Sequence, residues 1–449
     1  CASPDDALKT RALAAVPDVC RTFTMLADFL TYVEGQRGWG RGLRKAVASW
    51  YTGKSVDDLA YQAVKYRQRN GWTHRDALRL AHPKTSDPAR AMVFDWMAHG
   101  SGLEPGDNSR ASNILHAHTV AMAPDSPPDH IRKMQAEENL PWEALPTSAL
   151  GDPDLWRQMA PTMPIMALVR NLSRMTKNGA IGSSTGDKLA RAIAARLRDP
   201  EEIRKSRVHP LALLFAHSAY SRTSPGGYMP YSYSALSDVH APNSTVVDAL
   251  DDAFALSFGN VQPTGGRTLI ALDVSGSMGT PLDRNNPTLT ARDASAAMAL
   301  VTCRAEEDYT VVGFTSGARS GGWYEESGLT VMPFGRRTSL KEAVQTVSGL
   351  NFGRTDCAMP MLWATERNER FDTIVIYTDN ETWAGTTHPH VALRHYRAKF
   401  GTSTRLIVVG MTSTGFSIAD PEDVGMLDVG GFDASAATLI SDFARGDLG

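Results

Sequence analysis

The chain has 449 residues, of which 42% are hydrophobic and 21% charged, and its formal net charge at pH 7 is −3. These values are typical of a globular protein with two or three domains. No run approaches the roughly 20 apolar residues that a membrane helix needs, and no secretory signal is visible. The four cysteines (Cys1, Cys20, Cys303, Cys357) are far apart and lack zinc-site spacing. They argue against a disulfide framework, and we expect a cytoplasmic protein without membrane contact.

Charge is unevenly distributed along the chain. Residues 266–449 contain 16 Lys and Arg against 22 Asp and Glu, whereas residues 1–265 contain 30 against 27. Within the latter, residues 35–85 contain 11 basic against 3 acidic side chains, together with His74 and His82. Such a local density of positive charge indicates a possible phosphate-binding surface.

Residues 1–265 show the pattern of successive short helices, and no clean strand alternation is present. Turn residues such as Gly53, Asn70-Gly71 and Pro200 separate amphipathic runs. Repeated short helices without a strict sequence period predict a HEAT-like α-solenoid. We expect helices at residues 24–33, 42–51, 58–68, 74–81, 90–99, 129–138, 165–176, 187–197, 210–220 and 244–257, and an exposed loop at 221–243.

Gly265-Gly266 marks the expected domain boundary, because helix and strand patterns alternate beyond it. The alternation predicts a doubly wound α/β domain with a mostly parallel sheet over residues 266–449. Strands are expected at 268–273, 309–314, 329–334, 373–378 and 405–411. Helices are expected at 291–306, 340–350, 389–400 and 435–444.

A candidate metal site lies at the end of the first of these strands. Asp273-Val-Ser275-Gly-Ser277 follows a short apolar run, which is typical of a buried parallel strand. Thr355 in a later loop and Asp379 after a second buried strand add a hydroxyl and a carboxylate at the edge where open α/β sheets bind ligands. Oxygen ligands suit a hard cation such as Mg²⁺. The five residues resemble the metal-ion-dependent adhesion site of a von Willebrand A domain.

Other interpretations explain less of this pattern. Asp273 could cap a turn, with the serines bonded to local backbone, but this leaves Thr355 and Asp379 unexplained. A serine hydrolase would need a Gly-x-Ser-x-Gly turn, and a dehalogenase-type phosphatase would need an Asp where Ser275 stands. A metal-dependent nuclease clusters several carboxylates, whereas this set is mostly hydroxyls.

The basic residues of the first half suggest nucleic-acid contacts. Lys65 and Arg69 are four residues apart, so on a helix they share a face. Together with Arg67 they could form charge-assisted contacts with phosphates, and the arginines could also stack on unpaired bases. A solvated helix face is the alternative. His82 by itself is expected to be a satisfied, partly buried histidine.

Two further groups of basic residues have the same ambiguity. The first is Arg41, Arg44 and Lys45. The second, Arg170 and Arg174 with Lys177, repeats at helical spacing, and salt bridges to neighbouring repeats are its alternative explanation.

Several strings together resemble the TROVE module, which is shared by telomerase-associated, Ro and vault proteins. They are Arg41-Gly-Leu-Arg44-Lys45-Ala with Trp50-Tyr51, Lys65-Tyr-Arg67-Gln-Arg69-Asn70-Gly71-Trp72, Leu80-Ala-His82-Pro, Met166-Ala-Leu-Val-Arg170-Asn171-Leu172 and Thr378-Asp-Asn-Glu-Thr-Trp383-Ala-Gly385. A TROVE module followed directly by a von Willebrand A domain resembles the Ro autoantigen family in particular. The intact Ser-Gly-Ser and the compact loops favour a bacterial member.

The resemblance implies RNA binding without catalysis. Ro proteins form a ring of HEAT-like helices that the A domain closes. We expect this chain to form such a ring as a monomer. They bind small Y RNAs on a basic outer surface and take single-stranded 3′ ends of misfolded RNAs into the central hole. Bacterial relatives act in RNA quality control and maturation, tethered through Y RNA to the exonuclease polynucleotide phosphorylase. The Y RNA contacts of the family map onto Lys65, Arg69 and His82, and the helix that carries Arg170 and Arg174 would face the hole.

Two further expectations follow. Family members carry additional helices before the point where this chain begins, and we expect these to be missing only from this chain. If they were truly absent, closure of the ring and the function of the hole would be in doubt. The competing hypothesis is a metal-dependent protein–protein adhesion module on a helical scaffold. It predicts a partner that requires Mg²⁺ and no affinity for RNA.

Overall fold

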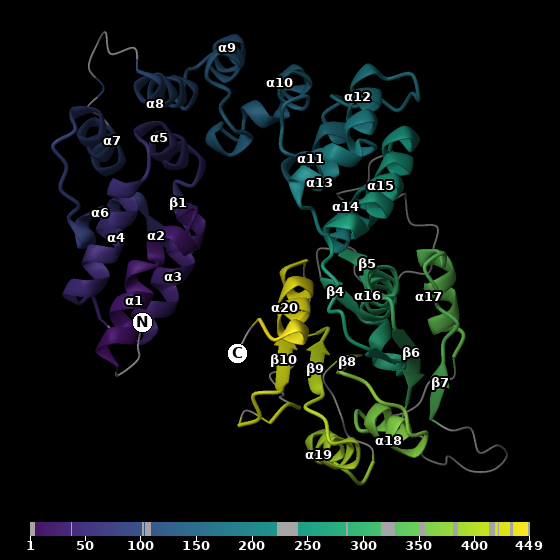
Figure 1. Cartoon of the computed structure of the whole chain (residues 1–449). Coiled ribbons are helices and arrows are strands. Elements are labelled where there is room, and N and C mark those ends of the chain that lie inside the picture. Colours follow the sequence, from purple (N-terminus) through teal and green to yellow (C-terminus); the bar gives the residue numbers. More distant parts are fainter. Residues whose placement is uncertain are drawn as a thin grey trace. The chain divides into compact units, whose positions relative to one another are not determined.

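A computed structural model describes residues 5–36, 38–100, 103, 109–221, 241–283, 286–315, 328–350, 355–379, 385–412, 418–420, 422–431 and 434–447 (Figure 1). The residues outside the described ranges include most of the expected loop at 221–243, the Gly353-Arg354 pair and residues 380–383. The chain divides into two compact units, unit 1 (Cys1–Met163) and unit 2 (Pro164–Gly449). None of the helices in the described ranges is long and apolar enough to cross a membrane. The domain boundary expected at residue 265 stays a prediction.

The part of unit 1 that the structure describes is helical apart from one short ribbon of two strands. Its helices are α1 (Asp6–Ala14), α2 (Val16–Val19), α3 (Phe23–Gln36), α4 (Arg41–Gly53), α5 (Val56–Lys65), α6 (His74–Ala81), α7 (Pro88–His99), α8 (Arg110–Ala121), α9 (Pro128–Glu138) and α10 (Pro153–Met159), with β1 (Gln68–Arg69) and β2 (Trp72–Thr73) between α5 and α6. The expected helices are confirmed, although their ends differ by a few residues. The sequence pattern did not predict α1, α2, α8 or α10. Of these, α8 buries the polar Ser112 and His118 as well as apolar residues and so lacks a clean apolar stripe.

The helix expected at 58–68 ends early, because the chain turns into the β1–β2 hairpin. Asn70 and Gly71 have φ values of 49° and 81° and form the two-residue turn, for which Asn-Gly is the favoured pair. Arg69 pairs with Trp72 across the hairpin. Lys65 therefore ends a helix while Arg69 lies on a strand. The expectation that these two residues share one helix face is wrong.

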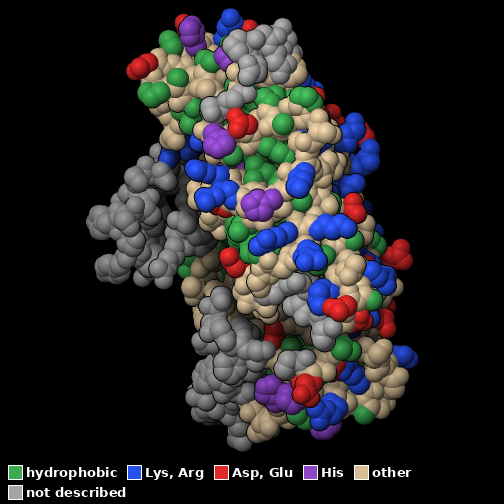
Figure 2. All heavy atoms as spheres, turned by 90° about the vertical axis from the view of Figure 1, so that its left-hand side faces the viewer, with side chains coloured by type: hydrophobic (Ala, Val, Ile, Leu, Met, Phe, Trp, Pro, Cys, Tyr) green, Lys and Arg blue, Asp and Glu red, His purple; other side chains and the backbone are tan. Residues whose placement is uncertain are grey.

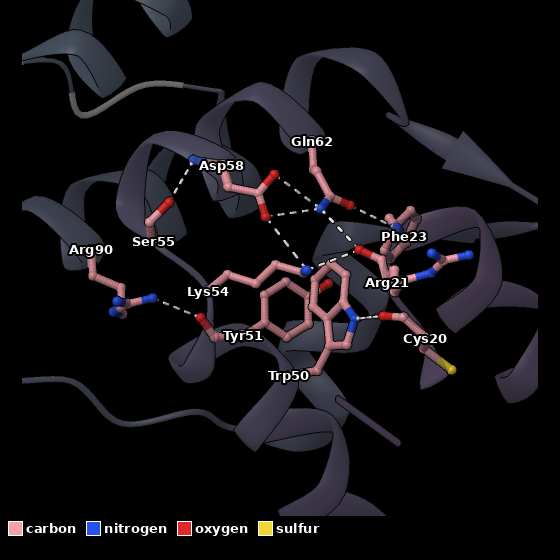
Figure 3. Close-up of polar contacts among 10 residues, drawn as sticks. All are labelled: Cys20, Arg21, Phe23, Trp50, Tyr51, Lys54, Ser55, Asp58, Gln62 and Arg90. Carbon is pink, nitrogen blue, oxygen red and sulfur yellow. Dashed lines mark hydrogen bonds and ion pairs between the residues drawn. The ribbon is translucent and has the colours of Figure 1, made fainter. Parts of the chain in front are cut away.

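A polar network fixes the turn between α2 and α3 against α4 and α5 (Figure 3). The side-chain carbonyl of Gln62 accepts a hydrogen bond from the Phe23 backbone N–H (2.8 Å), and its amide nitrogen donates to the carbonyl of Arg21 (3.3 Å). Lys54 donates to the same carbonyl (2.9 Å) and forms an ion pair with Asp58 (3.4 Å). Because Gln62 lies one turn before the end of α5, the network also fixes that helix end.

Replacing Gln62 with Leu is expected to destabilise the protein. The change leaves the Phe23 N–H without its acceptor in a buried position, which costs about 2 kcal/mol. Urea-induced unfolding followed by tryptophan fluorescence measures this loss. Gln68→Leu, at an exposed position of the hairpin, is the control and should change stability by less than about 0.5 kcal/mol. Equal stability of the two variants would contradict a structural role for the network.

Two buried histidines of unit 1 have strongly lowered pKa values. Burial lowers the pKa of His74 to about 3 and that of His118 to about 4, because the imidazolium would lose its hydration. Nδ1 of His74 lies 3.0 Å from the Tyr51 hydroxyl, and Nδ1 of His118 lies 2.8 Å from the carbonyl oxygen of Ala144. A carbonyl only accepts, so His118 carries its proton on Nδ1. Both rings are neutral in the folded protein at neutral pH.

These histidines make stability fall in mild acid. Below about pH 6.5 the unfolded chain binds protons at both imidazoles, whereas the folded protein does not until about pH 3 to 4. The unfolded state thus binds more protons, and the free energy of unfolding decreases as the pH falls. His74→Gln is expected to reduce the loss between pH 7 and pH 5 by roughly 2 kcal/mol. Urea unfolding at both pH values tests this, and the exposed His116→Gln should leave the loss unchanged.

Unit 2 begins with helices and continues into a sheet domain. The helices are α11 (Ile165–Lys177), α12 (Lys188–Leu197), α13 (Pro200–Ser206), α14 (Pro210–Tyr220) and α15 (Ser244–Ser257). The sheet domain contains β3 (Thr268–Asp273), β4 (Pro281–Asp283), β5 (Asn286–Thr290), α16 (Ala291–Ala305), β6 (Tyr309–Phe314), β7 (Leu329–Val331), α17 (Leu340–Ser348), α18 (Met359–Glu366), β8 (Thr373–Thr378), α19 (Pro389–Phe400), β9 (Arg405–Gly410), β10 (Met426–Gly430) and α20 (Ala434–Arg445). Leu211 and Leu214 of α14 pack into the same core as α16 and α20, which joins the helices to the sheet domain.

The main sheet has the strand order β10-β9-β8-β3-β6-β7, and only β7 is antiparallel to its neighbour. Alternate residues of each strand enter two separate cores. Ile270 and Leu272 of β3 face the core of α16, α17 and α20, whereas Leu269 and Ala271 face that of α18 and α19. The doubly wound α/β fold is confirmed. Five elements of unit 2 were not expected from the sequence, namely α13, β4, β5, α18 and β10.

Candidate functional site

The candidate metal site lies at the carboxyl edge of the main sheet. The central strand β3 ends at Asp273, and its parallel neighbour β8 ends at Thr378, directly before Asp379. The register places Leu272 level with Tyr377, so the two strands end side by side. Thr355 comes from the loop between α17 and α18. Three segments distant in the sequence therefore bring their polar residues to one place.

Hydrogen bonds show which side chains meet there. Oδ2 of Asp273 accepts from the hydroxyls of Thr355 (3.3 Å) and Thr378 (2.8 Å). Oδ1 of Asp273 accepts from the Ser275 backbone N–H (2.8 Å), and the Ser275 and Ser277 hydroxyl oxygens lie 3.0 Å apart. The structure thus brings together four of the five predicted ligands, and Asp379 follows Thr378 directly. Sequence reasoning missed Thr378, because an apolar strand gives no signal for its last hydroxyl.

Asp273 is a buried carboxylate at the centre of this cluster. Burial raises the pKa of Asp273 to about 6, and the neighbouring charge of Asp379 also raises it, although hydrogen bonds from Ser275 and Thr378 act in the opposite direction. Burial likewise raises the pKa of Asp356, the residue after Thr355. A cation placed against the Asp273 oxygens would offset this cost.

The donor set fits a hard cation. Asp273, Ser275, Thr355 and Asp379 are buried and Ser277 is exposed, so a bound ion would keep contact with solvent on one side. Hydroxyl and carboxylate oxygens with room for water are the ligands that Mg²⁺ prefers. In the described ranges, no group of three or more His, Cys, Asp or Glu could hold a metal. A site here would therefore depend on the hydroxyls.

Arg292 of α16 supports the loop that carries the serines. Its Nη2 donates to the backbone carbonyl of Ser275 (3.0 Å). Burial lowers the pKa of Arg292, while the charges of Asp293 and Asp273 act to raise it. The guanidinium thus positions the Ser275 backbone and contributes positive charge near Asp273.

The second candidate site is a basic surface on unit 1. Figure 2 shows Lys, Arg and His side chains gathered on the side of the molecule where α4 and α6 lie in Figure 1. The exposed basic residues on α4, on α6 and in the segments next to these helices are Arg41, Arg44, Lys45, Arg67, Arg75, Arg79, His82 and Lys84. Arg75, Arg79 and Lys84 were not predicted individually, although the four-residue spacing of the two arginines on α6 was a usable signal.

His82 lies on this surface in an unusual backbone conformation. It ends α6 with a φ of 49°, in the left-handed region, and its side chain is exposed. The expectation of a partly buried histidine is wrong, because the left-handed residue at the helix end turns the chain away from the core.

Lys65 and Arg69 are close together despite lying on different elements. Nη2 of Arg69 donates to the Lys65 carbonyl (3.3 Å), and both side chains approach the ring of Tyr66. Burial acts to lower the pKa of Lys65, but the neighbouring Tyr61, Tyr66 and Glu143 outweigh it and raise the pKa. Lys65 is therefore a fixed positive charge at neutral pH.

The remaining predicted cations belong to unit 2. Arg170 and Arg174 lie on α11 and are exposed, together with Lys177. The opposite side of α11 is buried through Leu168, Leu172 and other residues. These cations form a stripe along one helix.

Comparisons with known proteins cover nearly the whole chain. A TROVE domain model matches residues 2–101 and 121–224, and a Ro60 vWA domain model matches residues 267–444. RNA-binding protein RO60 of Deinococcus radiodurans is 41% identical over 450 residues, which are 99% of this chain and 80% of that protein. RNA-binding protein RO60 of Caenorhabditis elegans is 34% identical over 499 residues, which cover 98% of this chain and 73% of that protein.

A solved structure has the same fold. The crystal structure of the Deinococcus radiodurans RO (RSR) protein matches with a TM-score of 0.83 at 40% identity, covering 99% of this chain and 85% of that one. The two family models occur in the order expected from the sequence motifs. The chain therefore belongs to the Ro family, in which a TROVE domain precedes a von Willebrand A domain, and it has a bacterial orthologue at 41% identity.

Proposed function

We propose that this chain is a noncatalytic RNA-binding protein of the cytoplasm. It binds a small structured RNA of the Y RNA type through the basic surface of unit 1, and single-stranded 3′ ends of misfolded RNA through the α11 cations in the hole of a monomeric ring. It acts in RNA quality control and maturation as a scaffold for an exonuclease such as polynucleotide phosphorylase. The names of the two relatives support RNA as the partner.

One observation carries the proposal. Lys65 and Arg69 are held by their own protein contacts, and Arg67 between them in the sequence is exposed. Positive side chains held in place at a surface can neutralise successive phosphates with little loss of side-chain entropy. A surface of solvated charges would lack such anchoring.

The candidate metal site favours a second function, which can coexist with the first. We propose that Asp273, Ser275, Ser277, Thr355 and Asp379 bind Mg²⁺ or another divalent cation, whose open positions accept an acidic side chain of a protein partner. The buried, hydroxyl-bonded Asp273 supports this adhesion function. If adhesion were the main function, the helices would be a scaffold without affinity for RNA.

RNA binding should depend on Lys65 and Arg69 and on salt. The Lys65→Ala/Arg69→Ala double variant is expected to bind a Y-like stem-loop roughly tenfold more weakly, because two phosphate contacts are lost. The slope of log affinity against log salt should fall by about 2. Filter binding at several salt concentrations measures both quantities.

The matched control for RNA binding removes two charges elsewhere. Lys205→Ala/Lys341→Ala replaces two exposed lysines of unit 2 and should keep the affinity for the stem-loop. An equal loss in both double variants would mean that only net charge matters. No binding of either RNA class by the unmodified protein would favour the adhesion function instead.

Mg²⁺ is expected to stabilise the protein through Asp273. At about 100 times its Kd, a ligand of the folded state adds about 2.7 kcal/mol to stability. Asp273→Asn should abolish this gain, and without metal it should match or exceed the stability of the unmodified protein, because the amide carries no buried charge. Thermal unfolding with Mg²⁺ or EDTA tests both points. The control is Glu307→Gln, which replaces an exposed carboxylate before β6 and should keep the stabilisation by Mg²⁺. Stabilisation by Mg²⁺ that persists in Asp273→Asn would refute the site.

A further inference from the structure

The aromatic ring of Tyr66 lies between Lys65 and Arg69 in the sequence and close to both of them in space. Nζ of Lys65 is 5.4 Å from the centre of the Tyr66 ring, and the guanidinium carbon of Arg69 is also 5.4 Å from it. Both distances are within the roughly 6 Å over which a cation and an aromatic ring attract each other. Lys65 is also 5.5 Å from the ring of Tyr61. Tyr66 is thus an aromatic side chain with two fixed positive charges over its ring.

The backbone holds this arrangement rigidly. The N–H of Tyr66 donates to the Gln62 carbonyl (2.9 Å), and Gln62 is anchored by the network of Figure 3. Nη1 of Arg69 donates to the Gln68 carbonyl (2.7 Å). The hairpin tip is held in turn by a hydrogen bond from Asn70 to the Asp28 carboxylate of α3. Ring and guanidinium are therefore preorganised before any ligand binds.

The cluster also remains accessible. Tyr66, Lys65 and Arg69 are half-buried, and the intervening Arg67 and Gln68 are exposed. Tyr51, by contrast, has no exposed surface and its hydroxyl contacts His74. Tyr66 thus keeps part of its surface in solvent, next to charges that attract phosphate.

An unpaired nucleotide has the chemistry that fits this cluster. A base outside a duplex exposes a face that stacks on an aromatic ring, and its flanking phosphates need nearby cations. A base inside a duplex is already stacked on both faces and cannot use the ring. Phosphate contacts alone cannot tell the two apart, so the ring would add selectivity that Lys65 and Arg69 lack.

We propose that Tyr66 is a stacking platform for one unpaired base of the bound RNA, and that Lys65 and Arg69 contact the phosphates on its two sides. This inference rests on the proposed RNA binding and goes beyond it, because it assigns a preference for unpaired nucleotides to a particular side chain. Tyr66 then acts through direct contact with RNA rather than by holding Lys65 in place.

The test compares two RNAs that differ in one nucleotide. One is a stem-loop with a single unpaired 2-aminopurine in its stem, and the other is the same stem-loop with that nucleotide paired. Tyr66→Leu is expected to weaken binding of the first RNA roughly tenfold and to leave the second unchanged. Tyr66→Phe keeps the ring and should bind both like the unmodified protein. Tyr32→Leu removes another exposed tyrosine of unit 1 and is the matched control.

Fluorescence gives a readout of base stacking that is independent of the affinity measurement. The unmodified protein should quench the unpaired 2-aminopurine by stacking, and Tyr66→Phe should do the same, whereas Tyr66→Leu should not. Equal weakening of both RNAs by Tyr66→Leu, without loss of quenching, would assign Tyr66 a purely structural role and overturn the inference. Failure of the unmodified protein to bind either RNA would instead refute the proposed function.

Discussion

The parallel pairing of β3 with both β6 and β8 determines where unit 2 can carry chemistry. Every residue of β3 is buried, and hydrogen bonds on both sides fix its register. Parallel neighbours end at one edge, so the residues that follow them are forced together. Asp273 and Thr378 meet there because both strands stop at the same level. The carboxylate is buried as a consequence of the sheet, and its raised pKa follows from that burial.

Unit 1 depends on a different constraint, which is the satisfaction of polar groups between short helices. Short helices expose many backbone groups at their ends, and each must find a partner or remain in water. Gln62 and Lys54 provide such partners for the turn at Arg21. Lys54 is therefore used for structure, whereas the half-buried Lys65 and Arg69 adjoin the exposed Arg67 and Gln68 in the chain. The distinction between structural and available cations explains why counting basic residues alone does not locate a binding site.

The two candidate surfaces suit opposite partners. The basic surface of unit 1 attracts phosphate, and its preorganised cations favour a nucleic acid. The oxygen cluster of unit 2 would attract a cation and, through it, an acidic group. Both surfaces lie within regions that match Ro family domains. Under the proposed function, unit 1 would hold RNA and unit 2 a protein partner, and RNA scaffolding would unite these two properties.

Local patterns in the sequence determined the fold class, most helices and five of the six strands of the main sheet. They also determined the grouping of Asp273, Ser275 and Ser277. Periodicity and strand-end motifs act over a few residues, so a single sequence is enough to show them. Tertiary structure alone decided the rest. The Asn70-Gly71 turn ends α5 and moves Arg69 to a strand, yet side-chain contacts return it to Lys65 and Tyr66. Thr378 and Arg292 join the candidate metal site only through contacts with residues at least 17 positions away. Such contacts depend on how distant segments pack, which no short pattern in a single sequence encodes.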